Sequence, residues 1–271
     1  MTLSTIAQTL LKCYDQARSV ETGLVPASLT MTDAIEIQAE IIKARKNRGE
    51  TPVGYKIGFT NRTIWERYGV SHPIWAPVYD STLTLLADDA TPEISVARFT
   101  EPRLEPEIVI SVAQTPTSHT VEAISDSIGW VAHGFEIVQS VYPVWQFTAA
   151  QSMAAQALHG ALLVGQPCPP QTFQTTSTLA AQLSQLTLKL YRSGRKTPVD
   201  EGVGSNVLDG PIQALAYLSK ELDNLGAQLQ PGDIITTGTL TDAQPLAPGQ
   251  QWRSELSQAG PLKNLTLTVK P

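Results

Sequence analysis

The sequence of 271 residues predicts an α+β fold, with a helical N-terminal region over residues 1–50 and a strand-rich domain over residues 51–271. In the first region apolar residues recur every three or four positions, which is the spacing of an amphipathic helix. From residue 52 onward, short apolar and β-branched runs alternate with Gly and Pro, as is typical of short strands and turns. A chain of this length can bury a substantial core.

Two helices are expected in the N-terminal region. The first places its apolar face on Ile6, Leu10, Tyr14 and Ala17. The second begins near Thr30, because Thr30 and Asp33 have the spacing of a capping box. We expect it to place Ile35, Ala39 and Ile42 on one face.

The second region contains strands with a few helices between them. We expect strands over 53–58, 103–112, 134–138, 161–164, 234–240 and 262–269. Helices are expected over 61–68, 120–127, 149–158 and 211–226, and a polar connection over 167–178. Pro106 has no backbone N–H for a strand ladder, so we expect an edge strand or a bulge at that position.

Composition excludes several classes of protein. The formal net charge is −6 and no long basic run occurs, which argues against binding to nucleic acid. No uninterrupted apolar stretch of about 18 residues is present, and the N-terminus lacks a secretory pattern, so we expect no membrane span and a cytoplasmic location. Cys13 and Cys168 are far apart without ligand spacing, which predicts neither a disulfide framework nor a zinc site.

The most informative feature is a set of three glutamates on two expected strands. Glu105 and Glu107 flank Pro106, and Glu136 follows on the next strand. Side chains alternate along a strand, so Glu105 and Glu107 share one face. Two adjacent anions repel, and a hard divalent cation is the usual partner for such oxygen ligands. The alternative is a half-exposed strand with an acidic outer face.

The order of the motifs resembles the 2-hydroxypentadienoate hydratase / 4-oxalocrotonate decarboxylase family, within the fumarylacetoacetate-hydrolase-like superfamily. The matching segments are residues 54–60 (GYKIGFT), 77–80 (PVYD), 103–107 (RLEPE), 135–138 (FEIV), 159–165 and 229–241 (LQPGDIITTGTLT). The resemblance implies a mixed β-roll-like core and a Mg²⁺ or Mn²⁺ ion. It also implies a small 2-keto or 2-hydroxydienoic acid substrate from the breakdown of aromatic compounds. The expected assembly is a homo-oligomer, and a complex with a related pathway enzyme is the alternative.

The resemblance also assigns roles to residues. Glu105, Glu107 and Glu136 match the metal-binding carboxylates of the family. Lys56 matches a lysine that contacts the acidic end of the substrate or transfers a proton, although by itself it also fits a surface lysine on a Gly-rich edge strand.

Two further groups match with alternatives open. Asp80 matches an acidic residue near the substrate, but a turn-capping aspartate explains it equally well. Residues Thr237, Gly238 and Thr239 match a segment that lines the substrate cavity, although alternating threonines are also simply good strand formers.

The resemblance implies a metal-dependent lyase that adds water to a 2-hydroxydienoic acid. A 2-keto acid decarboxylase shares every motif and is the alternative, and a non-catalytic scaffold subunit of the same fold is the third. The histidines (His72, His119, His133 and His159) form no recognisable catalytic triad and are expected to be packed or exposed, which argues against hydrolysis of a C–C bond. Gln139, Ala155 and Gln156 depart from the family pattern, so substrate or metal binding can differ from that of the family.

Overall fold

The computed structural model describes residues 1–88, 90–173 and 178–271. Within them the α-helices are α1 (Leu3–Asp15), α2 (Met31–Asn47), α3 (Trp65–Tyr68), α4 (Val121–Asp126), α5 (Ala149–Ala154), α6 (Leu179–Gln185) and α7 (Pro211–Asn224). The strands are β1 (Pro52–Gly58), β2 (Ile74–Tyr79), β3 (Leu83–Leu85), β4 (Glu93–Ser95), β5 (Arg103–Val112), β6 (Ile128–Val138), β7 (His159–Val164), β8 (Thr187–Arg192), β9 (Asp200–Val203), β10 (Ile234–Thr239), β11 (Gln244–Pro245), β12 (Gln251–Ser257) and β13 (Thr266–Lys270). The α+β, strand-rich fold predicted from the sequence is confirmed.

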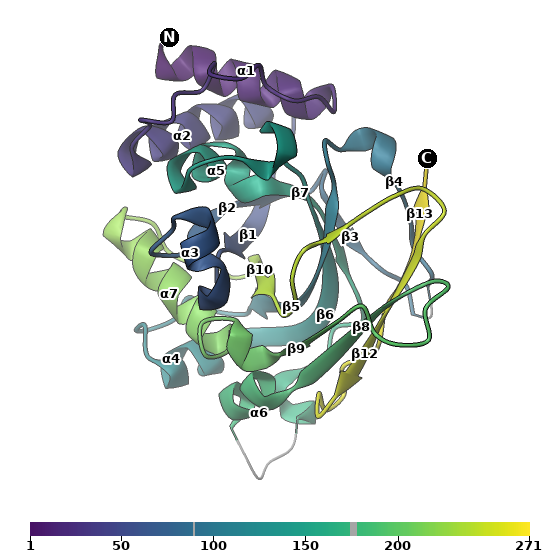
Figure 1. Ribbon diagram of the computed structural model, residues 1–271. Helices are drawn as coiled ribbons and strands as arrows, with labels where there is room; N and C mark the ends of the chain where they lie inside the picture. The colour runs from purple at the N-terminus through teal and green to yellow at the C-terminus, as the bar shows by residue number, and fades with distance from the viewer. Residues whose placement is uncertain (89, 174–177) are drawn as a thin grey trace.

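The strands form two sheets. The larger sheet has the order β2-β1-β10-β5-β6-β7-β3, with β11 paired to β5, and the smaller has the order β4-β13-β12-β8-β9. Most neighbours are antiparallel, but three pairs are parallel: β1 with β10, β3 with β7, and β4 with β13. Helix α7 lies on one side of the larger sheet, and β8, β12 and β13 extend along the opposite side of the molecule (Figure 1). In the strand order, the long pair β5 and β6 has neighbours on both sides and so lies in the interior of the larger sheet.

The N-terminal helices α1 and α2 lie together with α5 at one end of the molecule (Figure 1). The Thr30 side chain caps α2 and the Asp33 side chain bonds back to the cap, which confirms the predicted capping box. Leu10, Ile37 and Met153 from the three helices are buried in the same hydrophobic core as the larger sheet. None of the helices in the described part of the chain has the length and apolar character that a bilayer crossing needs.

Two local predictions were wrong. The helix expected over 149–158 ends at Ala154, because Gln156, Ala157 and Leu158 have φ angles of 53°, 49° and 65°. The segment around α6 was expected to be connection and strand, although Thr178 caps a helix there by accepting from the Ala181 amide. Residues 174–177 of the expected connection lie outside the described residues.

Pro106 lies in an interior strand, so the expectation of an edge was wrong. It faces Phe135 of β6, and its carbonyl oxygen accepts from the Leu240 amide on the other side. The bulge is in the neighbouring strand: Thr236 pairs with Val109, but Thr239 pairs with Glu107. The strand β10 thus carries one extra residue beside Glu107. The bulge lies where a regular ladder would need a backbone N–H from Pro106, which proline does not have.

Gly238 belongs to this bulge and cannot be replaced without strain. Its φ is 112°, and a Cβ at this position would lie 1.8 Å from Thr60 Oγ1. We expect Gly238→Ala to lower the free energy of unfolding by about 3 kcal/mol, since a left-handed backbone and a displaced buried side chain both add to the cost. Urea denaturation measures this loss.

Gly232→Ala is the matched control, because Gly232 has φ 94° but no atom within 4 Å of the added Cβ. We expect it to cost about 1 kcal/mol from the backbone alone. Equal losses in the two variants would show that the close approach at Thr60 does not constrain the bulge.

Candidate metal and substrate site

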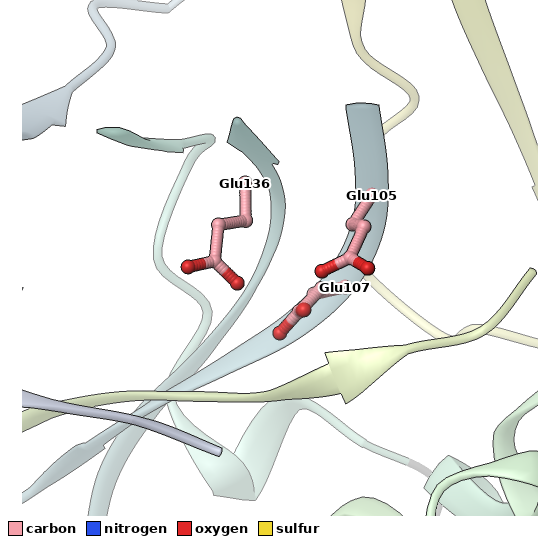
Figure 2. A group of neighbouring side chains, drawn as sticks. All are labelled: Glu105, Glu107 and Glu136. Atoms are coloured by element: carbon pink, nitrogen blue, oxygen red, sulfur yellow. The ribbon is translucent and has the colours of Figure 1, made fainter. Parts of the chain in front are cut away.

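Three carboxylates converge from two adjacent strands. Glu105 and Glu107 extend from β5 and Glu136 extends from β6, and the three side chains point toward a common space (Figure 2). Glu105 is the direct cross-strand partner of Glu136. One oxygen from each of the three lies within 4.8 Å of the others. The register of β5 and β6 therefore brings together the three predicted ligands.

The glutamates are buried to different degrees and held by different donors. Glu107 and Glu136 are fully buried, whereas Glu105 is partly exposed. Oε2 of Glu107 accepts from the Thr236 hydroxyl and, at 2.7 Å, from the Gly238 amide in the bulge of β10. Its Oε1 is buried and has no hydrogen-bond partner among the described residues. A buried carboxylate oxygen that has no donor and lies near two other carboxylates fits a ligand to a cation.

Lys56 provides one positive charge beside this group. It extends from β1, and its Nζ lies 3.1 Å from Glu136 Oε2 and 3.9 Å from Glu105 Oε2. Its side chain is 3% exposed, so the alternative of a surface lysine on an edge strand is excluded. Burial lowers the pKa of the ammonium, but the charges of Glu136, Glu105 and Glu107 outweigh this effect and raise the pKa above its ordinary value.

One ammonium does not neutralise three carboxylates. Burial, together with the charge of Glu136, raises the pKa of Glu105 to about 7 and outweighs the lowering effect of Lys56. Burial and the charges of Glu136 and Glu105 raise the pKa of Glu107 well above its ordinary value. For Glu136 burial acts in the same direction, but Lys56 and a hydrogen bond from His159 leave its pKa lowered. The donor set suits a hard divalent cation, which prefers carboxylate oxygens.

A cavity opens beside these residues. Lys56 and Glu105 form part of its wall, and so do Gly238 and Thr239 of the segment that was expected to line it. Much of the remaining wall is apolar and includes Ile57, Ile64, Ile74, Val138, Trp145, Phe147 and Leu158. Thr237 is not among the lining residues: it is buried, and its hydroxyl donates to the Ile108 carbonyl at 2.8 Å.

Asp80 lies outside this group. It is exposed, and its Oδ1 accepts from the Thr51 amide at 3.0 Å and the Ser81 amide at 2.8 Å. This is the turn-capping geometry that the sequence left open as the alternative. Ser81 also donates to Glu50, which forms ion pairs with Arg45 and Arg48, so the turn is tied to the end of α2.

His159 is the site residue that the sequence analysis missed. Its Nδ1 lies 2.7 Å from Glu136 Oε1, and its Nε2 lies 2.8 Å from the Thr82 hydroxyl. Burial lowers the pKa of His159 despite the opposing effect of Glu136, which favours the neutral ring. We assign its proton to Nδ1, which donates to the carboxylate, while Nε2 accepts from Thr82. Both ring nitrogens are occupied, so His159 orients Glu136 and is not free to activate water.

The three departures from the family pattern lie around this site. Gln139 is buried and its side-chain oxygen accepts from the Thr100 amide at 3.0 Å. The Ala155 carbonyl accepts from the Tyr14 hydroxyl at 2.5 Å, and Gln156 begins the left-handed segment that leads to His159. The one signal in the sequence that could have drawn attention to His159 was its place at the start of the matching segment 159–165.

Residues 70–268 match the fumarylacetoacetate (FAA) hydrolase C-terminal family, and the chain belongs to this family. A 4-oxalocrotonate decarboxylase from Pseudomonas sp. is 29% identical over 264 residues, which cover 97% of each chain. A 2-hydroxyhexa-2,4-dienoate hydratase from Comamonas testosteroni is 27% identical over 248 residues, which cover 89% of each. The solved structure of 4-oxalocrotonate decarboxylase from Pseudomonas putida G7, complexed with magnesium and adipate, has the same fold, with a TM-score of 0.86 at 21% identity over 98% of this chain and 97% of that one.

We expect His159→Leu to weaken Mg²⁺ binding by about 10- to 100-fold, because loss of a hydrogen-bond partner that orients a metal ligand typically lowers metal affinity by this factor. His159→Asn keeps a nitrogen donor near the position of Nδ1 and should recover part of the loss. Calorimetric titration with Mg²⁺ measures both. Unchanged affinity in His159→Leu would show that Glu136 does not need this partner.

The Glu50 cluster gives a prediction for acid stability. Burial raises the pKa of Glu50, but the Ser81 hydrogen bond and the charges of Arg45 and Arg48 outweigh it, so the pKa lies below the ordinary 4.5. The unfolded chain then takes up the proton first as the pH falls. The stabilisation is therefore present above pH 4.5 and is lost as the pH falls through the pKa of the folded state.

Glu50→Gln should lower the free energy of unfolding by about 1–2 kcal/mol at pH 7, with a smaller difference at pH 4. Urea denaturation at both pH values measures it. Glu93→Gln is the control, because the ion pair of Glu93 with Lys270 is exposed and contributes little. A difference between wild type and Glu50→Gln that is the same at both pH values would contradict the assignment.

Proposed function

We propose that this chain is a divalent-metal-dependent lyase that acts on a small unsaturated 2-keto or 2-hydroxydienoic acid. The observation that carries the proposal is the convergence of three carboxylates within 4.8 Å, beside a buried lysine, in the wall of a cavity. A non-catalytic subunit would have no physical reason to bury two of these anions fully. The names of the two curated relatives, a decarboxylase and a hydratase of small dienoic acids, support the same class of reaction.

Glu105, Glu107 and Glu136 would hold Mg²⁺ or Mn²⁺. When bound, such an ion supplies positive charge next to the carboxylate and the 2-oxygen of an oxo acid, where negative charge develops on enolisation. Lys56 adds a second cation on the same side and attracts the carboxylate of the substrate. Its Nζ can also hold a proton that leaves or returns to the substrate, because it is the one ammonium in the described part of the cavity wall.

Hydration is the reaction that we place first. The proton of the 2-hydroxyl group moves to the far end of the diene and gives an α,β-unsaturated ketone. Water then adds across the new double bond, with its hydroxyl on the carbon β to the ketone and a proton on the carbon next to the ketone. The apolar wall around Ile74, Val138 and Leu158 suits the hydrocarbon part of such a substrate. Gly238 and Thr239 also line the cavity, next to Glu107, which accepts from the Gly238 amide.

Decarboxylation is the second candidate, and a specific observation favours it. The relative that matches 97% of this chain, and the solved structure with a TM-score of 0.86, are both 4-oxalocrotonate decarboxylases. The same site would serve, since loss of CO₂ leaves an enolate that the same positive charges stabilise. A proton then has to reach the enolate oxygen, which gives the 2-hydroxydienoic acid, or a carbon of the dienolate, which gives the keto acid.

We assign the chemistry to residues 51–271, because the glutamates, Lys56 and the cavity all lie there. The helical region 1–50 supports the site from outside: Tyr14 donates to the Ala155 carbonyl, and Gln38 donates to the Trp75 carbonyl at 3.0 Å. A substrate-proximal role for Asp80, assembly into an oligomer and a cytoplasmic location stay predictions from the sequence.

Incubation with 2-hydroxypenta-2,4-dienoate and with 4-oxalocrotonate, in Mg²⁺ or in EDTA, tests the proposal when the product masses are measured. Gain of water identifies a hydratase, and loss of CO₂ identifies a decarboxylase. Turnover of either must disappear in EDTA. Absence of any metal-dependent turnover, with no Mg²⁺ binding by calorimetry, would favour the scaffold subunit.

Glu107→Gln separates function from stability. We expect it to lower kcat/KM by at least about a thousandfold, since it removes a full charge from the site. In EDTA the free energy of unfolding should stay equal or rise, because the amide still accepts from Gly238 and no longer repels its neighbours. Glu36→Gln, at an exposed position on α2, is the control and should change neither quantity.

A further inference from the structure

Thr60 has a buried hydroxyl group in the wall of the same cavity, and no atom of the described residues bonds to it. The side chain is 2% exposed, and its Oγ1 is a buried polar atom without a hydrogen-bond partner. The other hydroxyl groups of the described wall are satisfied: Thr239 donates to the Thr241 carbonyl at 2.9 Å, and Thr241 donates to the Asp242 carbonyl at 3.1 Å. A buried hydroxyl without a partner is costly, so that of Thr60 fits a contact with a molecule in the cavity.

Asn61, the next residue, offers a second free polar group. It is 8% exposed and also lines the cavity. Its Oδ1 accepts from the Thr63 amide at 3.0 Å and from the Thr63 hydroxyl at 2.7 Å, and so caps the 3₁₀-helix Arg62–Ile64. The backbone N–H of Thr63 can only donate, which fixes the atom that faces it as the oxygen. The Nδ2 group donates to no atom of the described residues, so it is available to the cavity.

The backbone holds this pair next to the glutamates. The Thr60 carbonyl accepts from the Leu208 amide at 3.1 Å, which fixes the segment after β1. The Thr60 hydroxyl lies against Gly238, where an added Cβ would be 1.8 Å from Oγ1. The Gly238 amide donates to Glu107 at 2.7 Å. The Thr60 hydroxyl therefore lies beside the glycine that binds one of the expected metal ligands.

The chemistry of the pair differs from that of the charged part of the wall. Lys56 and Arg103 are cations that suit the anionic parts of a substrate, and Glu105 is a carboxylate. Thr60 and Asn61 are neutral: a hydroxyl group can accept as well as donate, and an amide nitrogen donates. Such a pair suits a neutral oxygen. Hydration consumes one neutral oxygen species, which is water.

We propose that Thr60 and Asn61 hold the water that adds to the substrate. This inference rests on the proposed function and refines its first reaction. The water accepts from Asn61 Nδ2 and donates to Thr60 Oγ1, which leaves a lone pair for the carbon β to the ketone. As the C–O bond forms, the π electrons of the double bond pass to the enolate. The ammonium of Lys56 gives a proton to the carbon next to the ketone, and the proton that the water releases restores it, so one H₂O is added in all.

Two substitutions that keep the local structure test the proposal. Thr60→Val has nearly the same shape without the hydroxyl, and Asn61→Ser keeps an oxygen for the cap without the amide nitrogen. With 2-hydroxypenta-2,4-dienoate and Mg²⁺ in D₂O, NMR measures deuterium uptake at the far end of the diene separately from formation of the hydrated product. We expect both variants to lower kcat for hydration by about 10- to 100-fold, because the nucleophile loses its fixed position. Deuterium uptake should stay at the wild-type rate, since that step consumes no water.

Thr100→Val is the matched control. Thr100 is 6% exposed and its hydroxyl is likewise buried without a partner, but it does not line this cavity. The control should leave both rates unchanged, and Thr60→Ser, which keeps a hydroxyl, should recover part of the hydration. Equal losses of deuterium uptake and hydration in both variants, or no loss of hydration in either, overturn the proposal.

Binding of unreactive acids keeps the two proposals distinguishable. With saturating Mg²⁺, wild type and both variants are titrated with 4-hydroxypentanoate and with pentanoate, which lack the 2-oxygen and do not react. Wild type should bind the hydroxy acid about 3- to 10-fold more tightly, as one or two hydrogen bonds allow, and both variants should lose this preference.

The combined outcomes separate the two proposals. If wild type turns over neither 2-hydroxypenta-2,4-dienoate nor 4-oxalocrotonate but prefers the hydroxy acid, the proposed function fails and the site for a neutral oxygen stands. If turnover and preference are both absent, both proposals fail. If wild type shows metal-dependent decarboxylation but adds no water, the water site fails alone.

Discussion

The repulsion among three clustered carboxylates is the constraint on which the rest of the site depends. Two unit charges about 4 Å apart interact by about 4 kcal/mol in the effective dielectric of a protein surface. Glu105, Glu107 and Glu136 form three such pairs when all are ionised, and Lys56 offsets only part of the repulsion. The fold has to hold these groups together through other interactions, and a divalent cation would remove the conflict.

The larger sheet provides that support. The pairing of β5 with β6 fixes Glu105 opposite Glu136, and the bulge in β10 turns the Gly238 amide toward Glu107. Strand β1, which is parallel to β10, brings Lys56 to the same point. Three backbone ladders thus converge on the charged side chains, so the site is rigid before any ligand arrives. Rigid, preorganised charges are what stabilisation of a developing enolate needs.

The sequence predicted the glutamate cluster because alternation along a strand and the order of motifs are both local signals. It could not show that Pro106 lies inside the sheet, because the compensating bulge is about 130 residues away in β10. The motif around Asp80 indicated a position near the substrate, but in the structure this side chain caps a turn. The pairing of His159 with Glu136 depends on left-handed residues at 156–158, and alanine-rich sequence there indicated helix instead. Arg103 belongs to the motif at residues 103–107, but only the structure shows that its guanidinium packs on Trp145 in the cavity wall.

Anomalous diffraction from crystals soaked in Mn²⁺ tests the central claim most directly. We predict one strong peak in the space between Glu105, Glu107 and Glu136, with an oxygen of each within bonding distance and Lys56 still beside Glu136. The claim is contradicted if well-ordered crystals show no ion there, or show it elsewhere, while the three carboxylates remain clustered around Lys56 alone.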